Sequence, residues 1–383
     1  MALQWNAWPA ITSESIESTA TRSFERLWTA THRSACPEEL SSLVSSVFVP
    51  WGGAAIDETP AWPSDIGDDH SPYEFSLALT PDAAELRLLV EAQGSTGEFE
   101  STREACLRLN SRLAERGADL QRFEQIRDLL LPNVRHARFS LWHAITLAPG
   151  RLRAKAYLNP QIQGAAQATQ VTAAALRRLG IGASWSRIAA KIPSHYLSSD
   201  AVRYFALDLE KSATARVKVY VYLRDATAEA LESIAAFGPK YVMGQVTEFC
   251  RAMIGPNRLY NVWPICVYIA FTEKNAKPSG ITVQIPIRFY VPNDTIAHNR
   301  IRSYLKLRGI DSNTYDRALQ AVARRPLSTK SGLHSYVSLR TGRGTPRVTV
   351  YFGVELYQRA SLPSVRPIAV QADGGRRLRI RGC

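Results

Sequence analysis

Two stretches, RLRAKAYLNP at residues 151–160 and ARVKVYVYL at residues 215–223, repeat one pattern of cationic and tyrosine side chains alternating with apolar ones. In the first stretch, Arg153, Lys155 and Tyr157 share one face because successive side chains of a strand point in opposite directions. The other face carries only leucine and alanine. The pattern predicts a strand with one basic, aromatic face and one apolar face.

The second stretch has the same construction. Arg216, Lys218 and Tyr220 share one face, and three valines form the other. A basic, aromatic face backed by an apolar face is unusual for a strand. It is explained if the cations gather around an anion in an enclosed space while the apolar face packs on helices.

A long period runs through the chain. Lys155, Lys218, Thr282 and Thr349 follow one another at nearly equal intervals, each in an alternating stretch. Arg87 precedes Lys155 by a similar interval. A nearly fixed period of this length indicates repeated supersecondary units, each with room for two helices and two strands.

Between the alternating stretches lie segments rich in Ala, Leu, Arg and Glu with apolar residues at helical spacing. These are residues 101–131, 164–191, 226–252 and 294–325. Each is interrupted by a glycine, as expected between paired helices. The four glycines are Gly117, Gly180, Gly238 and Gly309.

A second candidate strand precedes each signature strand, in residues 137–147, 202–210, 262–271 and 333–340. The chain therefore predicts an α+β fold with an ααββ unit repeated about five times. A ten-stranded antiparallel sheet of this kind most easily closes into a barrel, because closure removes exposed edges. We expect a polar lumen, helices outside, and a single domain over residues 1–383, with residues 1–70 as the first helical part and residues 362–383 as a basic tail.

Composition limits the functional classes. No apolar run approaches the ~20 residues that a membrane helix needs, and no secretory signal is visible. The five cysteines show no CxxC spacing, which favours a reduced, cytoplasmic protein without a zinc site. The net charge of +13 is typical of nucleic-acid binding, but many lysines and arginines alternate within strands. We therefore expect neither a nucleic-acid nor a membrane partner, although a non-catalytic protein that binds nucleic acid or an anionic metabolite stays an alternative.

The stretch DIGDD at residues 65–69 superficially matches the Asp-rich metal motifs of isoprenoid synthases. Those motifs need a helix that aligns the carboxylates. Here Pro60, Pro63, Gly67 and Pro72 surround the acids, so the sequence predicts a loop and no metal site.

A series of motifs, taken in their order along the chain, resembles one known family, the dimethylallyltryptophan synthase-type aromatic prenyltransferases. The resemblance runs from about Ser71 to Tyr357 and rests on SPYEFS, LRLLVEA, RAKAYLNP, RVKVYVY, QIPIRFY, HSYVSL and RVTVYF. It implies the ABBA barrel of ten strands. It also implies an enzyme that transfers a dimethylallyl group, with geranyl left open, from its diphosphate to an indole. No cofactor is implied, because arginine and lysine take the place of Mg²⁺ on the diphosphate.

The resemblance also assigns site residues. The diphosphate-binding residues are Arg87, Lys155, Arg216, Lys218, Gln284 and Arg340, with Arg340 preferred over Arg343 and Arg347. The rings that shield the allyl cation are Tyr157, Tyr220, Tyr336 and Tyr351. Glu74 is the catalytic carboxylate that accepts the indole N–H, and Trp142 lies in the acceptor pocket.

Three positions depart from the family. Thr282 and Gln284 stand where many members have lysine and tyrosine, so one cation and one ring are missing. Trp142 stands near the position of a lysine that members alkylating a ring carbon use as a base. The adjacent His143 is expected to face outward, which leaves the proton acceptor unassigned and Glu74 as a candidate.

The acceptor also stays open at this point. Tryptophan, a cyclic dipeptide and a larger indole alkaloid all fit the resemblance, and a phenol or naphthalene is the alternative. Glu74 favours an indole, because a carboxylate suits an N–H donor. The resemblance suggests a bacterial-type enzyme of secondary metabolism acting on small molecules, as in alkaloid biosynthesis.

Overall fold

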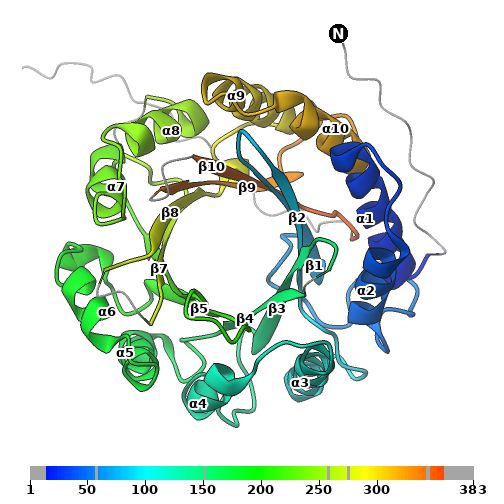
Figure 1. Ribbon diagram of the computed structural model, residues 1–383, viewed down its shortest axis with the longest axis horizontal. Coiled ribbons are helices and arrows are strands. Elements are labelled where there is room, and N and C mark those ends of the chain that lie inside the picture. Colours follow the sequence, from blue (N-terminus) through cyan, green and yellow to red (C-terminus); the bar gives the residue numbers. More distant parts are fainter. Residues whose placement is uncertain are drawn as a thin grey trace, which may run out of the picture.

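Ten antiparallel strands form a closed barrel, which a ring of helices surrounds (Figure 1). The computed structural model describes residues 14–56, 59–150, 152–256, 259–273, 277–341 and 346–357. The strand order around the barrel follows the chain from β1 to β10, and β10 pairs with β1. The predicted ABBA barrel is confirmed. The predicted basic tail, residues 362–383, lies outside the described residues.

Each repeat supplies two helices and then two strands. The first repeat contains α1 (Ile16–His32), α2 (Glu38–Phe48), β1 (Tyr73–Leu79) and β2 (Ala84–Val90). The second contains α3 (Phe99–Glu115), α4 (Gln121–Leu130), β3 (Leu141–Leu147) and β4 (Arg153–Leu158). The third contains α5 (Ala168–Arg178), α6 (Gly182–Ala189), β5 (Val202–Asp208) and β6 (Val217–Leu223). The fourth contains α7 (Ala228–Ala235), α8 (Gln245–Ile254), β7 (Ile265–Phe271) and β8 (Gly280–Ile285). The fifth contains α9 (Asp294–Leu307), α10 (Ser312–Val322), β9 (His334–Thr341) and β10 (Arg347–Phe352).

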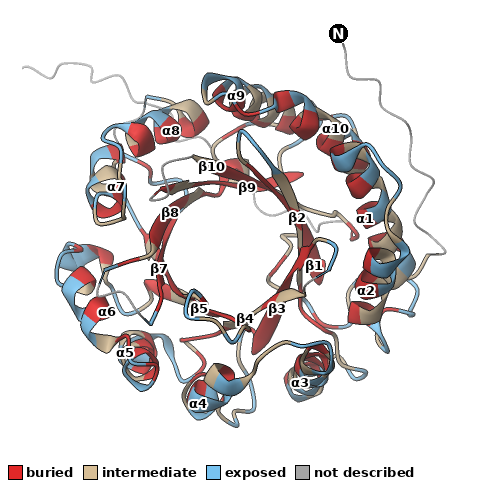
Figure 2. Cartoon of the chain, viewed as in Figure 1, coloured by how far each residue is buried: buried red, intermediate tan, exposed pale blue. Residues whose placement is uncertain are grey.

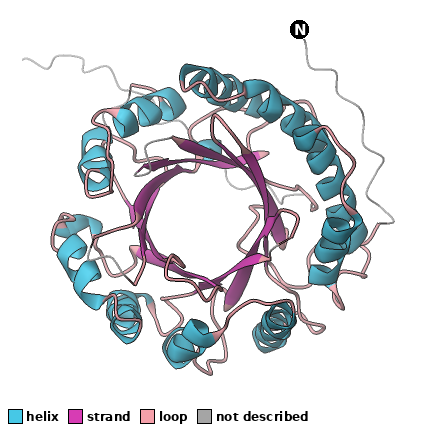
Figure 3. Cartoon of the chain, viewed as in Figure 1, coloured by secondary structure: helices cyan, strands magenta, loops and turns pink. Residues whose placement is uncertain are grey.

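Local sequence sets the ends of these helices. The side chains of Thr227, Asn293 and Asp311 accept backbone N–H bonds at the starts of α7, α9 and α10, which satisfies donors that the helix itself leaves free. Gly180 and Gly309 follow α5 and α9 with φ of 72° and 65°, a left-handed conformation that glycine adopts without steric cost. The four predicted glycine breaks therefore lie between the two helices of the second to fifth pairs. Figure 3 shows the helices around the barrel and the loops that join them.

The hydrophobic core lies between the barrel and the helices, not inside the barrel. Phe24 of α1, Phe123 of α4, Phe249 of α8 and Tyr315 of α10 are fully buried in this layer, as is Phe75 on the outer face of β1. Figure 2 shows the buried colour on the barrel and on the inward sides of the helices, with exposed residues on their outer sides. This arrangement leaves the lumen to polar and aromatic side chains.

His143 on β3 belongs to this outer layer, which confirms its predicted orientation. Its Nε2 lies 3.3 Å from Oδ1 of Asn110 on α3, and both residues are buried. Burial lowers the pKa of His143 to about 3, and Arg112 adds to the effect. The imidazole is therefore neutral and faces away from the lumen.

Candidate active site

A small lumen cavity at one level of the barrel is lined by six cationic side chains, and we call it the cation cup. The six are Arg87, Lys155, Arg216, Lys218, Arg340 and Arg347. They come from β2, β4, the start of β6, β6, β9 and β10, so strands from four of the five repeats contribute. Alternation along each strand turns these side chains inward, while their apolar neighbours face the helices.

Asp208 at the end of β5 holds two of these cations in place. Its carboxylate lies 3.6 Å from Nζ of Lys155 and accepts a bond of 2.8 Å from Nε of Arg216. Although burial acts in the opposite direction, Lys155 and Arg216 keep the pKa of Asp208 well below its usual range. Burial lowers the pKa of Lys155 to about 8, and Asp208 partly offsets this effect.

Glu85 on β2 holds the cationic side chains on the other side of the cup. It accepts bonds from Arg87 at 2.8 Å, Arg347 at 2.6 Å and Arg153 at 2.9 Å. Although burial opposes it, Arg87 and Arg347 hold the pKa of Glu85 well below its usual range. Two carboxylates thus orient the cationic groups and leave the cup strongly positive.

Lys218 stands apart within the cup. Its Nζ lies 4.8 Å from the ring centre of Tyr268, and it forms no ion pair with any carboxylate of the described residues. Burial lowers its pKa, and Arg216 and Lys155 lower it further. An anion that enters the cup can therefore pair with the Lys218 ammonium group and balance its charge.

Arg340 and Arg347 are cross-strand partners on β9 and β10. Gly280, at the start of β8, leaves space for the first of them, because a Cβ atom there would lie 3.2 Å from Nε of Arg340. Arg347 lines the cup as well as the predicted Arg340. Arg343 lies outside the described residues.

Gln284 is predicted to bind the diphosphate. It lies on the lumen face of β8, where its cross-strand partners are Cys266 on β7 and Ser338 on β9. The lumen residue of β8 that lines the cup is Thr282. Cys266 packs with the lumen tyrosines, so Gln284 lies beside the rings, two positions along the strand from the cup.

A continuous set of tyrosine rings leads away from the cup. The ring of Tyr268 lies 4.6 Å from that of Tyr220, whose hydroxyl donates to the hydroxyl of Tyr157 at 3.2 Å. The ring centres of Tyr220 and Tyr204 are 5.9 Å apart, in an edge-to-face arrangement. Tyr336 and Tyr351 form a second pair at 6.1 Å. The structure therefore brings the four predicted shield tyrosines into the lumen.

Glu74 on β1 is buried at the far side of these rings. Its carboxyl accepts a hydrogen bond from the Ser335 hydroxyl. Burial raises the pKa of Glu74 to about 7, while Ser335 and the nearby Arg288 pull it down. An entering N–H donor would supply a further partner for the ionised form.

A chamber with a cavity volume of about 740 Å³ opens at this end of the barrel. Tyr204, Tyr222 and Tyr336 line it from the strands. Trp263 lines it from a loop and stacks at 4.3 Å on Phe289, which ends the short 3-10 helix Ile287–Phe289. We call it the acceptor chamber. The walls combine these rings with charged side chains of both signs, and the space is large enough for a drug-sized ligand.

Trp142 on β3 lies next to this chamber. Its ring stacks on Phe139 at 4.2 Å and lies 5.3 Å from the ring of Tyr204. Trp142 is buried and faces the lumen, opposite Tyr157 on β4. It thus closes one wall between the shield rings and the chamber.

The DIGDD stretch crosses the mouth of the chamber as a loop, as predicted. Asp65 pairs with Arg138, and Asp68 pairs with Arg288, which also donates to the Ser335 carbonyl at 2.8 Å. These two aspartates hold arginines. The sequence indicates a loop here, but nothing in its local pattern indicates these ion pairs.

Comparison of the sequence with known protein families agrees with this geometry. The family model of tryptophan dimethylallyltransferases matches residues 37–318. The chain belongs to the tryptophan dimethylallyltransferase family. It is therefore a prenyltransferase, and the resemblance seen in the sequence is confirmed.

Solved structures agree with this assignment. A 6-dimethylallyltryptophan synthase from Micromonospora olivasterospora, in complex with DMASPP and Trp, is 31% identical with a TM-score of 0.84, over 91% of this chain and 100% of that one. PriB with product diphosphate is 30% identical with a TM-score of 0.82, over 91% and 100%. A 5-dimethylallyltryptophan synthase from Streptomyces coelicolor is 27% identical with a TM-score of 0.81, over 91% and 99%.

Two departures from the family pattern have counterparts on other strands of the barrel. Tyr268 on β7 is the cross-strand partner of Thr282, which stands where members have lysine, and supplies a ring two residues from Cys266, the partner of Gln284, where the tyrosine is missing. Arg347 adds a cation to the cup near Arg340. The alternation of residues 265–271 carried the signal for Tyr268, since it places Cys266, Tyr268 and Ala270 on one face.

The described residues contain no group of three or more His, Cys, Asp and Glu side chains arranged to hold a metal ion. Within the same ranges, none of the helices combines the length and apolar character that spanning a bilayer demands.

Proposed function

We propose that this prenyltransferase transfers a dimethylallyl group from dimethylallyl diphosphate to the indole of tryptophan or of a small molecule derived from it. The observation that carries the proposal is the order of parts along the lumen: a cation cup, a set of tyrosine rings, and the buried carboxyl of Glu74 in a small pocket that shares Asp68 and Arg288 with the acceptor chamber. Neighbours of known structure support it. The Micromonospora enzyme was solved with DMASPP and Trp, and PriB with L-tryptophan and dimethylallyl thiolodiphosphate.

The cup suits the leaving group. When the allylic C–O bond breaks, its electron pair stays with pyrophosphate, and negative charge develops on the leaving oxygen. Preorganised guanidinium and ammonium groups in a water-poor site stabilise such charge strongly. Arg87, Lys155, Arg216, Lys218, Arg340 and Arg347 would surround it, and Gln284 offers a neutral N–H donor beside the rings. We propose that these side chains do the work for which other prenyl-transferring enzymes use Mg²⁺.

The rings suit the allyl cation. A cation above an aromatic face gains about 0.5–2 kcal/mol from the ring quadrupole. Tyr157, Tyr220 and Tyr351, joined by Tyr268, would surround the cation near the cup, and Tyr336 would border the acceptor. The tyrosine rings also keep water, a competing nucleophile, away from the allyl cation until the indole attacks.

Glu74 suits the acceptor. Its carboxylate would accept the indole N–H, which fixes the ring against the allyl cation and raises its electron density. Trp142 and Tyr204 would form the wall along which the indole lies. Attack forms a bond between the indole and the allyl carbon, and one proton then leaves the indole. Glu74, directly or through water, is the group we propose to receive it.

Mass spectrometry tests the proposal. The purified protein would be incubated with EDTA, dimethylallyl or geranyl diphosphate, and a panel of tryptophan, tryptamine, a cyclic tryptophan dipeptide and a naphthalenediol. We expect an indole product one dimethylallyl unit heavier, formed with EDTA present. Product only after Mg²⁺ is restored would overturn the role given to the cup. Product from the naphthalenediol alone would overturn the role given to Glu74.

A further inference from the structure

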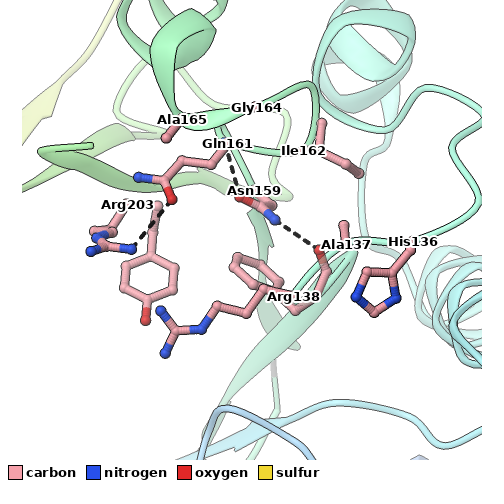
Figure 4. Close-up of a pocket in the computed structure, with 11 residues that line it drawn as sticks. His136, Ala137, Arg138, Asn159, Gln161, Ile162, Gly164, Ala165 and Arg203 are labelled. Atoms are coloured by element: carbon pink, nitrogen blue, oxygen red, sulfur yellow. Dashed lines mark hydrogen bonds between the residues drawn. The ribbon is translucent and has the colours of Figure 1, made fainter. Parts of the chain in front are cut away.

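Two recesses adjoin the acceptor chamber, and they differ in size. The larger has a volume of about 270 Å³ and shares Arg138, Arg203 and Tyr204 with the chamber, so it is a branch of the chamber itself (Figure 4). The smaller has a volume of about 30 Å³ and is lined by Glu74, and we call it the Glu74 pocket. A cavity needs about 10–15 Å³ to hold one water molecule. The Glu74 pocket therefore has room for about two water molecules and excludes an indole ring.

The Glu74 pocket runs between the acceptor chamber and the protein surface. Asp68 and Arg288, which form an ion pair, line both the pocket and the chamber. On the solvent side the pocket is lined by Lys330, whose Nζ lies 3.5 Å from Oε1 of Glu355, and half of the Lys330 side chain is exposed. The pocket therefore offers the buried Glu74 carboxyl a route to bulk water that does not cross the acceptor chamber.

The lining of the Glu74 pocket suits water. Ser331 and Ser335 offer hydroxyl groups, and the Ser335 hydroxyl donates to Glu74. Gly332 and Gly353 add backbone without side chains. A Cβ atom at Gly353 would lie 2.8 Å from the carbonyl oxygen of Gly332, so a larger residue there would force the backbone to shift. Buried water is held by two to four polar partners, and these groups supply them.

Glu74 needs such a route because it receives the proton that the indole loses. Each transfer leaves one proton on the Glu74 carboxyl, and the carboxylate must be restored before it can accept the next indole N–H. While product fills the acceptor chamber, the pocket is the side from which water reaches this carboxyl. Burial raises the pKa of Glu74 to about 7, so the carboxyl both takes up and gives up a proton near neutral pH.

We propose that the Glu74 pocket conducts the proton of the reaction from Glu74 to bulk solvent while the product is still bound. The proposal rests on the proposed function and adds an exit path to it. The O–H bond of protonated Glu74 breaks, and its electron pair stays on the carboxylate. The proton then passes along water beside Ser331 and reaches the solvent near Lys330.

Ser331→Leu tests the path, because an apolar side chain at this position takes the space of the water. In a single turnover with saturating tryptophan and a limiting amount of dimethylallyl diphosphate, rapid quenching measures the prenylated product, and a pH indicator in weak buffer measures released protons. In wild-type protein both signals should rise together. In Ser331→Leu the product should form at the wild-type rate, whereas proton release should be slower by at least about tenfold, as expected when an efficient proton transfer is lost.

Three further variants control for the size and place of the new side chain. Ser328→Leu puts leucine at an exposed position of the same loop, outside the pocket, and should match wild type. Ser331→Ala leaves the pocket open and should match it as well. Ser331→Val fills less of the pocket and should give a shorter delay, so the test does not depend on the leucine variant being folded.

Three results would overturn the proposal. In the first, Ser331→Leu, shown to be folded by thermal unfolding, releases its proton without delay. In the second, product formation in that variant slows as much as proton release. In the third, wild-type protein releases its proton only after the product has dissociated.

These results differ from a failure of the proposed function. Wild-type protein that forms no prenylated indole would contradict the function itself. A Glu74→Gln variant with full activity would contradict the role given to Glu74. If wild-type protein is active and Glu74→Gln is not, a silent Ser331→Leu shows that only the exit path is misassigned.

Discussion

At the scale of single residues, the cations of the cup differ in what compensates their charge. Lys155 shares Asp208 with Arg216, whereas Lys218 faces the ring of Tyr268. A buried ammonium group without a carboxylate contact destabilises the folded chain, because desolvation disfavours its charge. Such a group is retained where function requires it, and stability and activity then respond oppositely to its removal.

Lys218→Met tests this opposition. We expect kcat/KM for the diphosphate to fall more than about 100-fold, as for loss of a group that stabilises transition-state charge. The free energy of unfolding should stay level or rise by about 1 kcal/mol. Lys155→Met is the matched comparison and should lower both quantities, since Asp208 loses one partner. Urea unfolding and steady-state kinetics measure them, and an equal loss of stability in both variants would contradict the distinction.

The pH profile provides a second prediction at this scale. Glu74 must be ionised to accept the indole N–H, and its pKa is about 7, so kcat/KM should fall below that pH by up to about tenfold per unit. Lys155 must be protonated to bind the diphosphate, and its pKa is about 8, so activity should also fall above that pH. Initial rates between about pH 5 and 10 should therefore trace a narrow bell. In Glu74→Gln, the fall in kcat/KM on the acid side of the profile should disappear. In Lys155→Arg, the fall on the alkaline side should move to higher pH. If the profile of Glu74→Gln equals that of wild type, the Glu74 carboxyl does not cause the acid limb.

At the scale of elements, each strand contributes to the lumen through every second residue, and neighbouring strands substitute for one another. β8 lacks a ring at Gln284, and β7 supplies one two residues along the ladder, at Tyr268, which pairs with Thr282. The sequence prediction placed β7 correctly as a strand but gave its lumen face no role. The reason is that Cys266 and Ala270 flank the tyrosine, so the inward face of β7 is almost as apolar as its outward face.

A variant at Tyr268 tests whether the ring on β7 shields the allyl cation. Tyr268→Leu should let water reach the allyl cation, so that dimethylallyl alcohol rises as a share of the products by several-fold, since a cation–π contact contributes about 0.5–2 kcal/mol. Tyr268→Phe keeps the ring and should behave like wild type. Liquid chromatography of both products gives the ratio. An equal rise of the alcohol in both variants would show that the hydroxyl, not the ring, matters.

At the scale of the whole molecule, the barrel could be predicted because its signals are local and repeated. The sequence shows these signals directly: strand alternation around Lys155 and Lys218, glycine breaks such as Gly180, and the nearly even period of the alternating stretches. The acceptor end could not be predicted in the same way. Arg288 meets Asp68 although β1 to β8 lie between them in the chain, and nothing in either local stretch indicates that contact. Loops at the mouth depend on tertiary packing, which a single sequence does not record.

The pairing of β1 with β10 has a consequence for how this protein is made. Phe75 and Phe352 are register partners on the first and last strands, so the wall closes only after nearly the whole described chain is available. Contacts between such distant parts of a chain form slowly. A nascent polypeptide that lacks β10 exposes two unpaired sheet edges, which invite aggregation. We therefore expect the growing chain to depend on chaperones until its last strand leaves the ribosome.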